Sequence, residues 1–498
     1  MDAEIELKLF FQVEQEEALI QLFDNLENCE FQWGRKLTNA YFDTADIQLR
    51  RWDMGLRVRG CDGALEQTIK TAGTVVGGIH SRPEFNVDIE QNFPILKLFP
   101  EKIWPKVADI SSLQSGLTCL FNTHFLRRTW HISVGESLIE VALDMGKIEV
   151  EIAGELITEP ICELEFELLK GEAASLIHIG LQVAEHVPVR LGQASKAQRG
   201  YRLAEQAGPL SLAALTFMPL KPEHDLQQAL ITLISTGLEQ WQLLEAMIVE
   251  SVFILDKQAF ELCVRLRICL RLLRCVLLQF NVMNTVFKAW FDCIEGHLHL
   301  VETELNYVNF LHDKGSLNHK AIQHEPLNYQ ILAQLEQVDI RLRIETMLQS
   351  LDYGCLQLAL VELLFALKSG EKFIDNDVIL QDFADQIQES SWLEVLRSVP
   401  LSGDLSCDEL LAFVQASEEN LCVGITYGAF YSTKAKELFT APWNRLLLRS
   451  QRLLAYRQLS KQANMTAIEP WLADEEESLL SAMEHTRTAA LNNVPYWR

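Results

Sequence analysis

Glu4-Ile5-Glu6-Leu7-Lys8 opens the chain with a strict alternation of charged and apolar residues. Successive residues of a β-strand point to opposite faces, so Glu4, Glu6 and Lys8 share one face and the apolar residues share the other. Two carboxylates and an ammonium on one face suit a metal ion beside an anionic ligand. They suit a solvated edge strand equally well, and the choice depends on whether the pattern recurs.

The same alternation recurs through residues 1–205 and predicts a strand-rich region. An amphipathic helix is expected near Glu16–Leu26, and the turn at Asp62-Gly63 between two strand patterns is typical of a β-hairpin. The predicted strands after the first are Lys36–Phe42, Gly55–Arg59, Leu65–Lys70, Ile79–Val87, Phe125–Val134, Leu138–Met145 and Ile161–Leu169. Arg127 and Arg128 point to opposite faces, so only one of them can join the charged face.

Three glutamates alternate on the last of these strands, at positions 163, 165 and 167. Like charges on one strand face repel one another, and neighbouring carboxylates disfavour mutual ionisation. The arrangement is therefore costly unless cations lie among the carboxylates. A strand that faces solvent also tolerates it, so this second interpretation stays open for the strand taken alone.

About eight antiparallel strands with one polar and one apolar face predict a closed barrel with a charged lumen, covered by helices outside. Hard oxygen ligands without histidine or cysteine suit Mg²⁺ or Mn²⁺, and converging arginines and lysines suit phosphate groups. The predicted lumen contains the carboxylates Glu4, Glu6, Asp144, Glu163, Glu165 and Glu167, the cations Lys8, Arg57, Arg59, Lys70, Arg82 and Arg127, and, nearby, Ser195, Lys196 and Arg199.

Composition limits the partners of this lumen. The 498 residues carry a formal net charge of −26, which repels nucleic acid, anionic membranes and other polyanions at long range. A polyanion therefore needs a local, enclosed and densely basic site. The 11 cysteines are scattered without a CxxC pair, and no stretch has the length and apolarity of a signal or a membrane span. We expect free thiols in a cytoplasmic protein that binds neither nucleic acid nor membrane.

Helical periodicity replaces the strand pattern after a linker with two prolines, Phe217-Met218-Pro219-Leu220-Lys221-Pro222. The predicted fold class is therefore α+β: a β tunnel at residues 1–205, a linker at 206–222 and an all-α helical bundle at 223–498. The clearest predicted helices are Leu226–Val249, Lys257–Phe280, Val286–Tyr307, Leu327–Leu348, Leu356–Ser369, Leu405–Glu418 and Thr440–Gln462.

One of these helices carries a basic stripe, Arg267-x-x-x-Arg271-x-x-Arg274, on a single face. The same spacing recurs at Arg445, Arg449 and Arg452 and indicates two copies of a helical unit. The stripe is compatible with an anion site and equally with ion pairs inside an acidic protein.

Taken in order, the charged motifs of residues 1–205 resemble the CYTH domain of the triphosphate tunnel metalloenzymes. That family includes class IV adenylate cyclases, thiamine triphosphatases and inorganic triphosphatases. The resemblance rests on Glu4-x-Glu6-x-Lys8, Tyr41-Phe42-Asp43-Thr44, Gly55-Leu56-Arg57-Val58-Arg59, Thr68-Ile69-Lys70, Arg82-Pro83-Glu84-Phe85, Asp144-x-Gly146, Glu163-x-Glu165-x-Glu167 and Ser195-Lys196-x-x-Arg199-Gly200-Tyr201.

The resemblance implies a role for each matching residue. Divalent metal would be held by Glu4, Glu6, Asp144, Glu163, Glu165 and Glu167. The triphosphate oxygens would be bound, and the transfer catalysed, by Lys8, Arg57, Arg59, Lys70, Arg82, Arg127 and Lys196, with Arg199 as a further binding residue. Water would attack the terminal phosphorus in line with the leaving diphosphate, with metal ions stabilising charge at both ends.

The helical region resembles the CHAD domain, a helical module associated with polyphosphate binding. The likeness rests on the arginine stripe, but Val264 stands where a histidine ordinarily precedes the first arginine by three residues. The second copy also lacks that histidine. Polyphosphate binding through Arg267, Arg271 and Arg274 is therefore one expectation, and a purely structural module is the other.

The combination of both resemblances indicates an inorganic triphosphatase that depends on Mg²⁺ or Mn²⁺. Thiamine triphosphatase or adenylate cyclase activity on the same fold is the alternative within the enzyme class. A protein that binds polyphosphate without catalysis is the alternative outside it, although retention of Glu4, Glu6, Glu163 and Glu165 argues for an enzyme.

Overall fold

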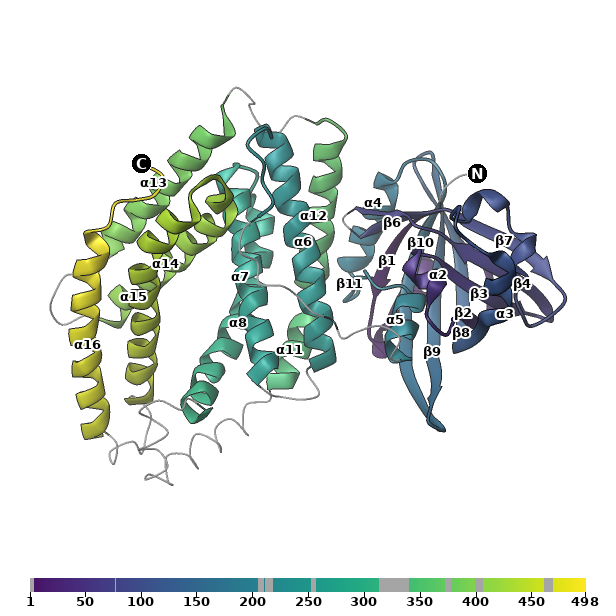
Figure 1. Ribbon diagram of the computed structural model, residues 1–498, viewed down its shortest axis with the longest axis horizontal. Coiled ribbons are helices and arrows are strands. Elements are labelled where there is room, and N and C mark those ends of the chain that lie inside the picture. Colours follow the sequence, from purple (N-terminus) through teal and green to yellow (C-terminus); the bar gives the residue numbers. More distant parts are fainter. Residues whose placement is uncertain are drawn as a thin grey trace. The chain divides into compact units, whose positions relative to one another are not determined.

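In a computed structural model of the chain, the described residues are 4–76, 78–204, 210, 218–251, 257–312, 340–371, 378–398, 406–460 and 469–498. They fall into two compact units, Met1–Ser211 with Thr346–Phe365, and Leu212–Glu345 with Ala366–Arg498. The first unit is the antiparallel sheet and its helices, and the second is helical (Figure 1). This arrangement confirms a strand-rich region followed by a helical one. The boundaries 1–205, 206–222 and 223–498 stay a prediction.

The first unit is built on one antiparallel sheet whose strands are longer than the sequence pattern predicts. Its strands are β1 (Glu4–Phe10), β2 (Cys29–Thr44), β3 (Gly55–Cys61), β4 (Ala64–Lys70), β5 (Thr74–Val76), β6 (Ile79–Arg82), β7 (Glu84–Ile89), β8 (Leu117–Val134), β9 (Ser137–Ile152), β10 (Glu155–Lys170) and β11 (Arg190–Leu191). The sheet thus has 11 strands among the described residues rather than about eight. β5 and β11 are additional, and the single strand predicted at Ile79–Val87 is wrong because Pro83 divides it into β6 and β7.

The order of the strands makes the sheet curl. It runs β5-β6-β1-β10-β9-β8-β2-β3-β4-β7, with β11 added beside β1. β6 and β7 lie near opposite ends of this path, yet only Pro83 separates them in the chain. Proline cannot donate to a strand ladder, so it ends β6 and lets the chain change neighbours. A flat sheet cannot satisfy both pairings, and the sheet therefore bends back toward itself.

The pairing register confirms the alternation on which the sequence analysis rests. Lys8 lies opposite Glu165, and Glu6 lies opposite Glu167 on one side and His80 on the other. The hairpin between β3 and β4 forms at Asp62-Gly63, where both residues have positive φ, as a tight two-residue turn requires. Apolar residues of the outer face, such as Leu7 and Leu9, are fully buried.

Helices cover the outer face of the curled sheet. α1 (Glu16–Asn25), α2 (Gln48–Arg51), α3 (Ile110–Gly116), α4 (Ala174–Ala184) and α5 (Lys196–Leu203) belong to the N-terminal part of the unit. α4 contacts β1 and β10, and α5 contacts β8, β9 and β10. Ser195 begins α5 with a capping box: its hydroxyl accepts a hydrogen bond from the Gln198 backbone N–H, and the Gln198 side chain accepts one from the Ser195 N–H.

A helix from the C-terminal half of the sequence, α12 (Leu351–Lys368), completes the first unit. The buried Gln357 side chain accepts a hydrogen bond of 2.9 Å from the Leu191 backbone N–H of β11. Gly354 lies against the carbonyl group of Val189, and Leu358 approaches Gly180 of α4. The strand beside β1 is thus held by residues more than 150 positions away.

The second unit consists of α6 (Leu226–Ser251), α7 (Lys257–Gln279), α8 (Thr285–His312), most of α11 (Ile340–Leu348), α13 (Leu380–Ser398), α14 (Cys407–Tyr427), α15 (Thr433–Ser460) and α16 (Glu469–Leu491). The helices predicted at 226–249, 257–280 and 286–307 are confirmed. Of the other predicted ranges, residues 327–339, Leu405 and Gln462 lie outside the described residues, as does Phe217 of the linker.

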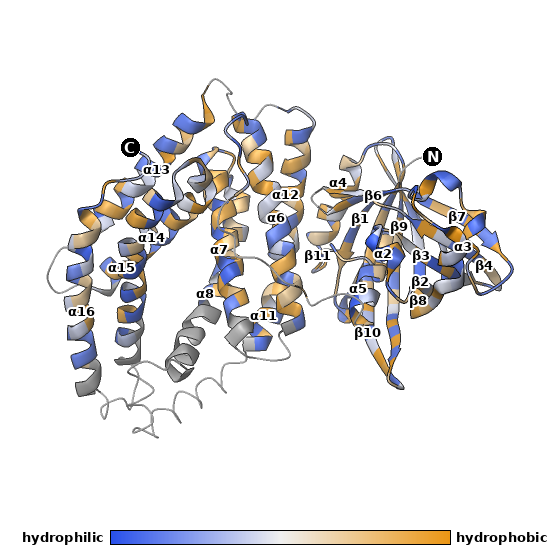
Figure 2. Ribbon diagram, in the orientation of Figure 1, coloured by the Kyte–Doolittle hydropathy of each residue, from blue (hydrophilic) through white to orange (hydrophobic). Residues whose placement is uncertain are grey.

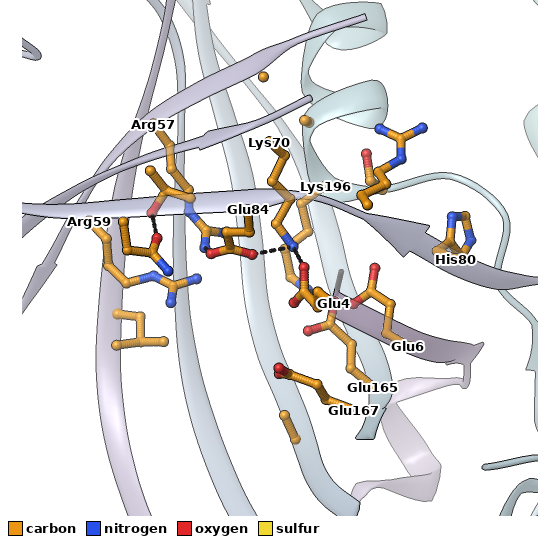
Figure 3. Close-up of a pocket in the computed structure, with 18 of the residues that line it drawn as sticks. Glu4, Glu6, Arg57, Arg59, Lys70, His80, Glu84, Glu165, Glu167 and Lys196 are labelled. Atoms are coloured by element: carbon orange, nitrogen blue, oxygen red, sulfur yellow. Dashed lines mark hydrogen bonds and ion pairs between the residues drawn. The ribbon is translucent and has the colours of Figure 1, made fainter. Parts of the chain in front are cut away.

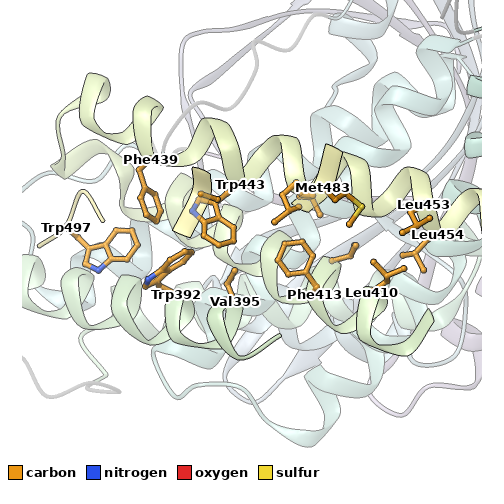
Figure 4. Packing of buried hydrophobic residues seen from close by; sticks show 14 residues of the cluster. Trp392, Val395, Leu410, Phe413, Phe439, Trp443, Leu453, Leu454, Met483 and Trp497 are labelled. Carbon is orange, nitrogen blue, oxygen red and sulfur yellow. The ribbon is translucent and has the colours of Figure 1, made fainter. Parts of the chain in front are cut away.

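One core cluster in the described part of the second unit combines aromatic rings with aliphatic side chains. Trp392 packs against Trp443 and Phe439 with ring centroids 4.5 and 5.1 Å away, in the edge-to-face geometry that aromatic pairs prefer (Figure 4). Apolar and polar residues alternate along the helices around this core (Figure 2). Among the described residues, no single helix is long and apolar enough to cross a membrane; only the bent pair Arg341–Leu348 and Leu351–Lys368 reaches that length and apolarity together.

The packing of α12 leads to a stability prediction for Gly354→Ala. A Cβ atom at Gly354 would overlap the Val189 carbonyl oxygen, so we expect a loss of about 1–3 kcal/mol in the free energy of unfolding. Differential scanning fluorimetry would report this as a lower Tm.

Gly296→Ala in α8 is the matched control, because a Cβ atom there meets no atom within 4 Å. Alanine also has the better helix propensity by about 1 kcal/mol at either position. The Tm of Gly296→Ala should therefore stay or rise. If both variants behave alike, the contact between α12 and Val189 is not tight.

Candidate active site in the curled sheet

The inner face of the curled sheet encloses a cavity of about 680 Å³. Its lining has nine basic residues, Lys8, Arg35, Arg50, Arg57, Arg59, Lys70, Arg82, Arg127 and Lys196. It has eight acidic ones, Glu4, Glu6, Asp53, Glu66, Glu84, Glu140, Glu165 and Glu167. A slight excess of cations in a chain with a net charge of −26 makes this cavity the local basic site that the composition requires.

One side of the cavity is a closed network of ion pairs centred on Lys196. Its ammonium lies 2.8 Å from Asp144, 2.5 Å from Glu163 and 3.0 Å from Glu165. Arg127 binds Asp144 through two hydrogen bonds of 2.7 Å and Glu165 through one of 2.6 Å. Every charge in this network therefore has an opposite charge in contact.

The network keeps its carboxylates ionised. Burial alone would favour the protonated form, but Lys196, Lys8 and Arg127 together hold the pKa of Glu165 well below its usual range. Lys8 lies 2.9 Å from Glu165 and 3.6 Å from Glu6.

Asp144 and Glu163 lie behind the cavity wall rather than in it. Both side chains are fully buried and bound by cations, and Glu163 is also bound by Arg199 at 2.6 Å. Arg199 itself binds Glu159 and the Pro160 carbonyl group. The structure thus separates these residues from the lining carboxylates Glu4, Glu6, Glu165 and Glu167, with which the sequence grouped them as metal ligands.

A second group of charges lies around Lys70 (Figure 3). Its ammonium binds Glu4 and, at 2.9 Å, Glu84. Glu84 also lies 3.5 Å from Arg57. Because of burial and of the neighbouring Glu6 and Glu84 carboxylates, which outweigh Lys70, the pKa of Glu4 is raised to about 8.

Arg59 and Arg82 are lining cations that have no carboxylate within ion-pair distance among the described residues. The Arg59 guanidinium donates a hydrogen bond of 3.0 Å to the amide oxygen of Asn39. Burial and the nearby Arg57 and Arg127 lower its pKa to about 10, so its positive charge is held at an electrostatic cost. An anion in the cavity would remove that cost, and Arg59 and Arg82 therefore mark where an anionic ligand is needed.

Just as the lining arginines favour an anionic ligand, some of the lining carboxylates favour a bound cation. The pKa of Glu167 is raised by burial and by Glu140, and burial raises the pKa of Glu4 although Lys70 contacts it. A further cation in the cavity would stabilise both carboxylates. Their oxygen atoms are the hard ligands that Mg²⁺ and Mn²⁺ prefer. No group of three or more His, Cys, Asp or Glu side chains in the described part of the chain already has metal-binding geometry.

The sequence analysis missed several lining residues as site residues, among them Glu84, Tyr41 and His80. Glu84 shares a strand face with Arg82, and this parity was a signal for its inward position. Tyr41 lines the cavity from β2, stacked on Phe121 with ring centroids 4.6 Å apart. His80 is nearly buried, and its pKa is lowered to about 4 by burial and by Lys8, so its ring is neutral.

The arginine stripe of the second unit is ion-paired. Arg267 and Arg271 both bind Glu418 of α14, at 3.2 Å in the case of Arg267. Arg274 binds Asp292 at 2.7 Å and Glu295 at 3.4 Å. In the second copy the contacts differ, because Arg449 donates to the Ala482 carbonyl group and Thr486, and Arg452 to Tyr456. The two stripes thus have the same spacing but different surroundings.

Comparison with known proteins shows what the N-terminal residues of the chain are similar to. The sequence model of the CYTH domain matches residues 2–201. The inorganic triphosphatase of Haemophilus influenzae is 39% identical over 175 residues, which are 34% of this chain and 46% of that protein. The chain thus spans less than half the length of this relative.

Two solved structures are similar at lower identity. HpAC1 from Hippeastrum, an adenylyl cyclase by name with a dominant triphosphatase activity, is 20% identical, covers 39% of this chain and 92% of its own, and has a TM-score of 0.29. The CHAD domain from Ricinus communis is 15% identical, covers 56% of this chain and 95% of its own, and has a TM-score of 0.42. Residues 2–201 of this chain are thus similar to the CYTH domain, and they hold the residues of the charged cavity.

Proposed function

We propose that this chain hydrolyses inorganic triphosphate to diphosphate and phosphate inside its curled sheet. The observation that carries the proposal is the pair of lining cations, Arg59 and Arg82, without a carboxylate partner among the described residues. A triphosphate supplies several negative charges in a row, which such a cavity requires. The likeness to a protein named inorganic triphosphatase supports the same substrate.

The lining cations fall into two groups, those that bind phosphate and those that already contact carboxylates. Arg59 and Arg82 bind phosphate oxygens directly. Arg57 and Lys70 both contact Glu84, and each binds phosphate by replacing part of that contact with a contact to a phosphate oxygen. Lys8, Arg127 and Lys196 already contact carboxylates, so they hold the wall of the site and add positive potential to it. Such preorganised cations favour the transferred phosphoryl group and the leaving diphosphate without reorganisation during the reaction.

Divalent metal fits the cavity, with Glu4, Glu6 and Glu167 as the residues that would hold it. Bound Mg²⁺ or Mn²⁺ would neutralise phosphate charge and acidify water for attack on the terminal phosphorus. Closure of the sheet into a complete tunnel belongs to the same proposal, because a closed wall excludes bulk water from the lumen and strengthens each electrostatic contact.

Phosphate release from a panel of substrates tests the function. We expect release from inorganic triphosphate with Mg²⁺ or Mn²⁺ and none with EDTA. ATP, thiamine triphosphate and long-chain polyphosphate complete the panel. Faster release from ATP or thiamine triphosphate would overturn the choice of substrate, and no metal-dependent release from any of the four would overturn the enzyme.

Glu6→Gln should lower metal-dependent turnover by about 100-fold or more. Loss of a residue that only hydrogen-bonds to a metal ligand already lowers metal affinity or activity by about 10- to 100-fold, and Glu6 is a proposed ligand itself. The uncharged amide keeps the shape of the side chain, so the Tm should change little. Glu30→Gln is the matched control, since Glu30 is an exposed residue of β2 outside the cavity. Near-parental activity of Glu6→Gln would show that Glu6 does not hold metal.

We propose a structural role for the arginine stripe of the second unit, because each of its arginines already contacts a carboxylate. Arg271→Ala combined with Arg274→Ala should lower the free energy of unfolding by about 1–3 kcal/mol, because Asp292 and Glu295 lose their cations while Glu418 keeps only Arg267. Urea denaturation measures this loss.

Arg397→Ala is the control for these variants, because Arg397 forms an exposed ion pair with Glu394, and it should have no measurable effect. Retention of polyphosphate by the parent, lost in the double variant, would favour polyphosphate binding instead.

A further inference from the structure

Arg50 of α2 lies at the cavity without a partner of opposite charge. Its guanidinium carbon is 5.4 Å from the centre of the Tyr201 ring, a cation–π contact. Its backbone N–H donates to the buried carboxylate of Asp43, which also accepts a hydrogen bond of 2.8 Å from the Tyr201 hydroxyl. The short helix and the ring therefore hold Arg50 in place, while no carboxylate lies within ion-pair distance of it among the described residues.

Arg35 of β2 has the same arrangement at another point of the lining. Its guanidinium carbon is 5.1 Å from the centre of the Trp33 ring, and both residues line the cavity. Its one ion pair in the described part of the chain is with Asp62 at 3.5 Å, where the two side chains are 50% and 69% exposed. An exposed pair of this kind contributes at most about 1 kcal/mol, so Arg35 can exchange Asp62 for another anion at little cost.

These two arginines lie at opposite ends of β3. α2 and Arg50 come just before Gly55, where β3 begins, and Asp62, the partner of Arg35, comes just after Cys61, where β3 ends. Seven extended residues separate the ends by roughly 20 Å. Arg57 and Arg59 lie between them on the same strand, and both line the cavity. The cations thus form a row along the lumen, with Arg50 and Arg35 at its ends.

Because the protein is strongly acidic, Arg50 and Arg35 can help an anionic ligand to reach the lumen. The protein carries a formal net charge of −26, and screening at physiological salt limits its repulsion of a triphosphate, and the attraction of any one cation, to about 8–10 Å. Arg59, in the middle of the row, is too far inside to offset this repulsion at the surface. Cations fixed at the ends of a lumen with low-dielectric walls focus the field and raise the association rate.

We propose that Arg50 and Arg35 are anion-attracting residues at the two ends of the lumen, which draw triphosphate toward Arg59 and Arg82. This inference rests on the proposed function for its substrate. It assigns to the two arginines a role in association and none in the chemical step, so their loss should change KM and leave kcat alone.

Arg50→Met and Arg35→Met test the proposal, because methionine keeps an apolar stem on the aromatic ring and removes the charge. Arg51→Met and Lys36→Met are matched controls. Each is the next residue on the same element, is exposed and lies outside the cavity lining, and each removes the same charge. All variants would be compared in kcat and KM for triphosphate, at low salt and at 1 M salt.

We expect kcat/KM of Arg50→Met and Arg35→Met to fall by roughly 3- to 10-fold at low salt, through KM, with the controls near the parent. At 1 M salt, where screening reaches about 3 Å, the difference should vanish. A loss in kcat with unchanged KM, an effect equal to that of the controls, or a loss that persists at 1 M salt would overturn the proposal.

Calorimetric titration of the metal-free protein with triphosphate in EDTA separates this inference from the proposed function. The salt dependence of Kd should be weaker in Arg50→Met and Arg35→Met than in the parent and the two controls. A parent that binds triphosphate with this pattern but releases no phosphate would overturn only the enzymatic function. Equal salt dependence in all five proteins would overturn the role of Arg50 and Arg35.

Discussion

Burial of a row of carboxylates is the constraint on which the first unit depends. Glu163 is fully buried and Glu165 nearly so on the same face of β10, and Asp144 is buried beside them. An unpaired charge at such a site costs several kcal/mol, so the strand can occupy its place only when cations reach it. They come from three separate elements, Lys8 on β1, Arg127 on β8 and Lys196 on α5.

This requirement couples the local structure of α5 to the lumen. The capping box at Ser195 fixes where the helix begins, and Lys196 is its first residue. Lys196 thereby enters the carboxylate network, while Arg199, one turn later, closes the network from behind. Once these charges are matched, the remaining cations of the lumen, Arg59 above all, are left for a ligand. A structural network on one side therefore creates a binding surface on the other.

The second unit uses the same interaction for a different end. Glu418 of α14 forms ion pairs with Arg267 and Arg271 of α7. Asp292 and Glu295 of α8 form ion pairs with Arg274 of α7. Partly buried pairs of this kind fix the register of packed helices. The spacing of arginines on a helix thus does not distinguish an anion site from a packing device, because the answer depends on which residues the neighbouring helices present.

The sequence by itself determined which side chains share a face. Strand periodicity is a local property, so Glu4, Glu6 and Lys8 were assigned to one side, and Arg127 was distinguished from Arg128, before any neighbour was known. The order of the charged motifs was likewise sufficient to indicate a likeness to the CYTH domain, which the family model matches over residues 2–201.

Only the tertiary structure decided which charges are available. Asp144 and Glu163 look like Glu4 and Glu6 in sequence, yet the first two are closed off by Lys196, Arg127 and Arg199, because register and curl bring distant elements into contact. The contribution of Glu84 and the placement of Arg50 over Tyr201 depend on such long-range pairings. The same is true of Gln357, whose hydrogen bond to Leu191 joins residues 166 positions apart. No local pattern encodes a contact of that separation, since its free energy comes from burial that exists only after the chain has folded.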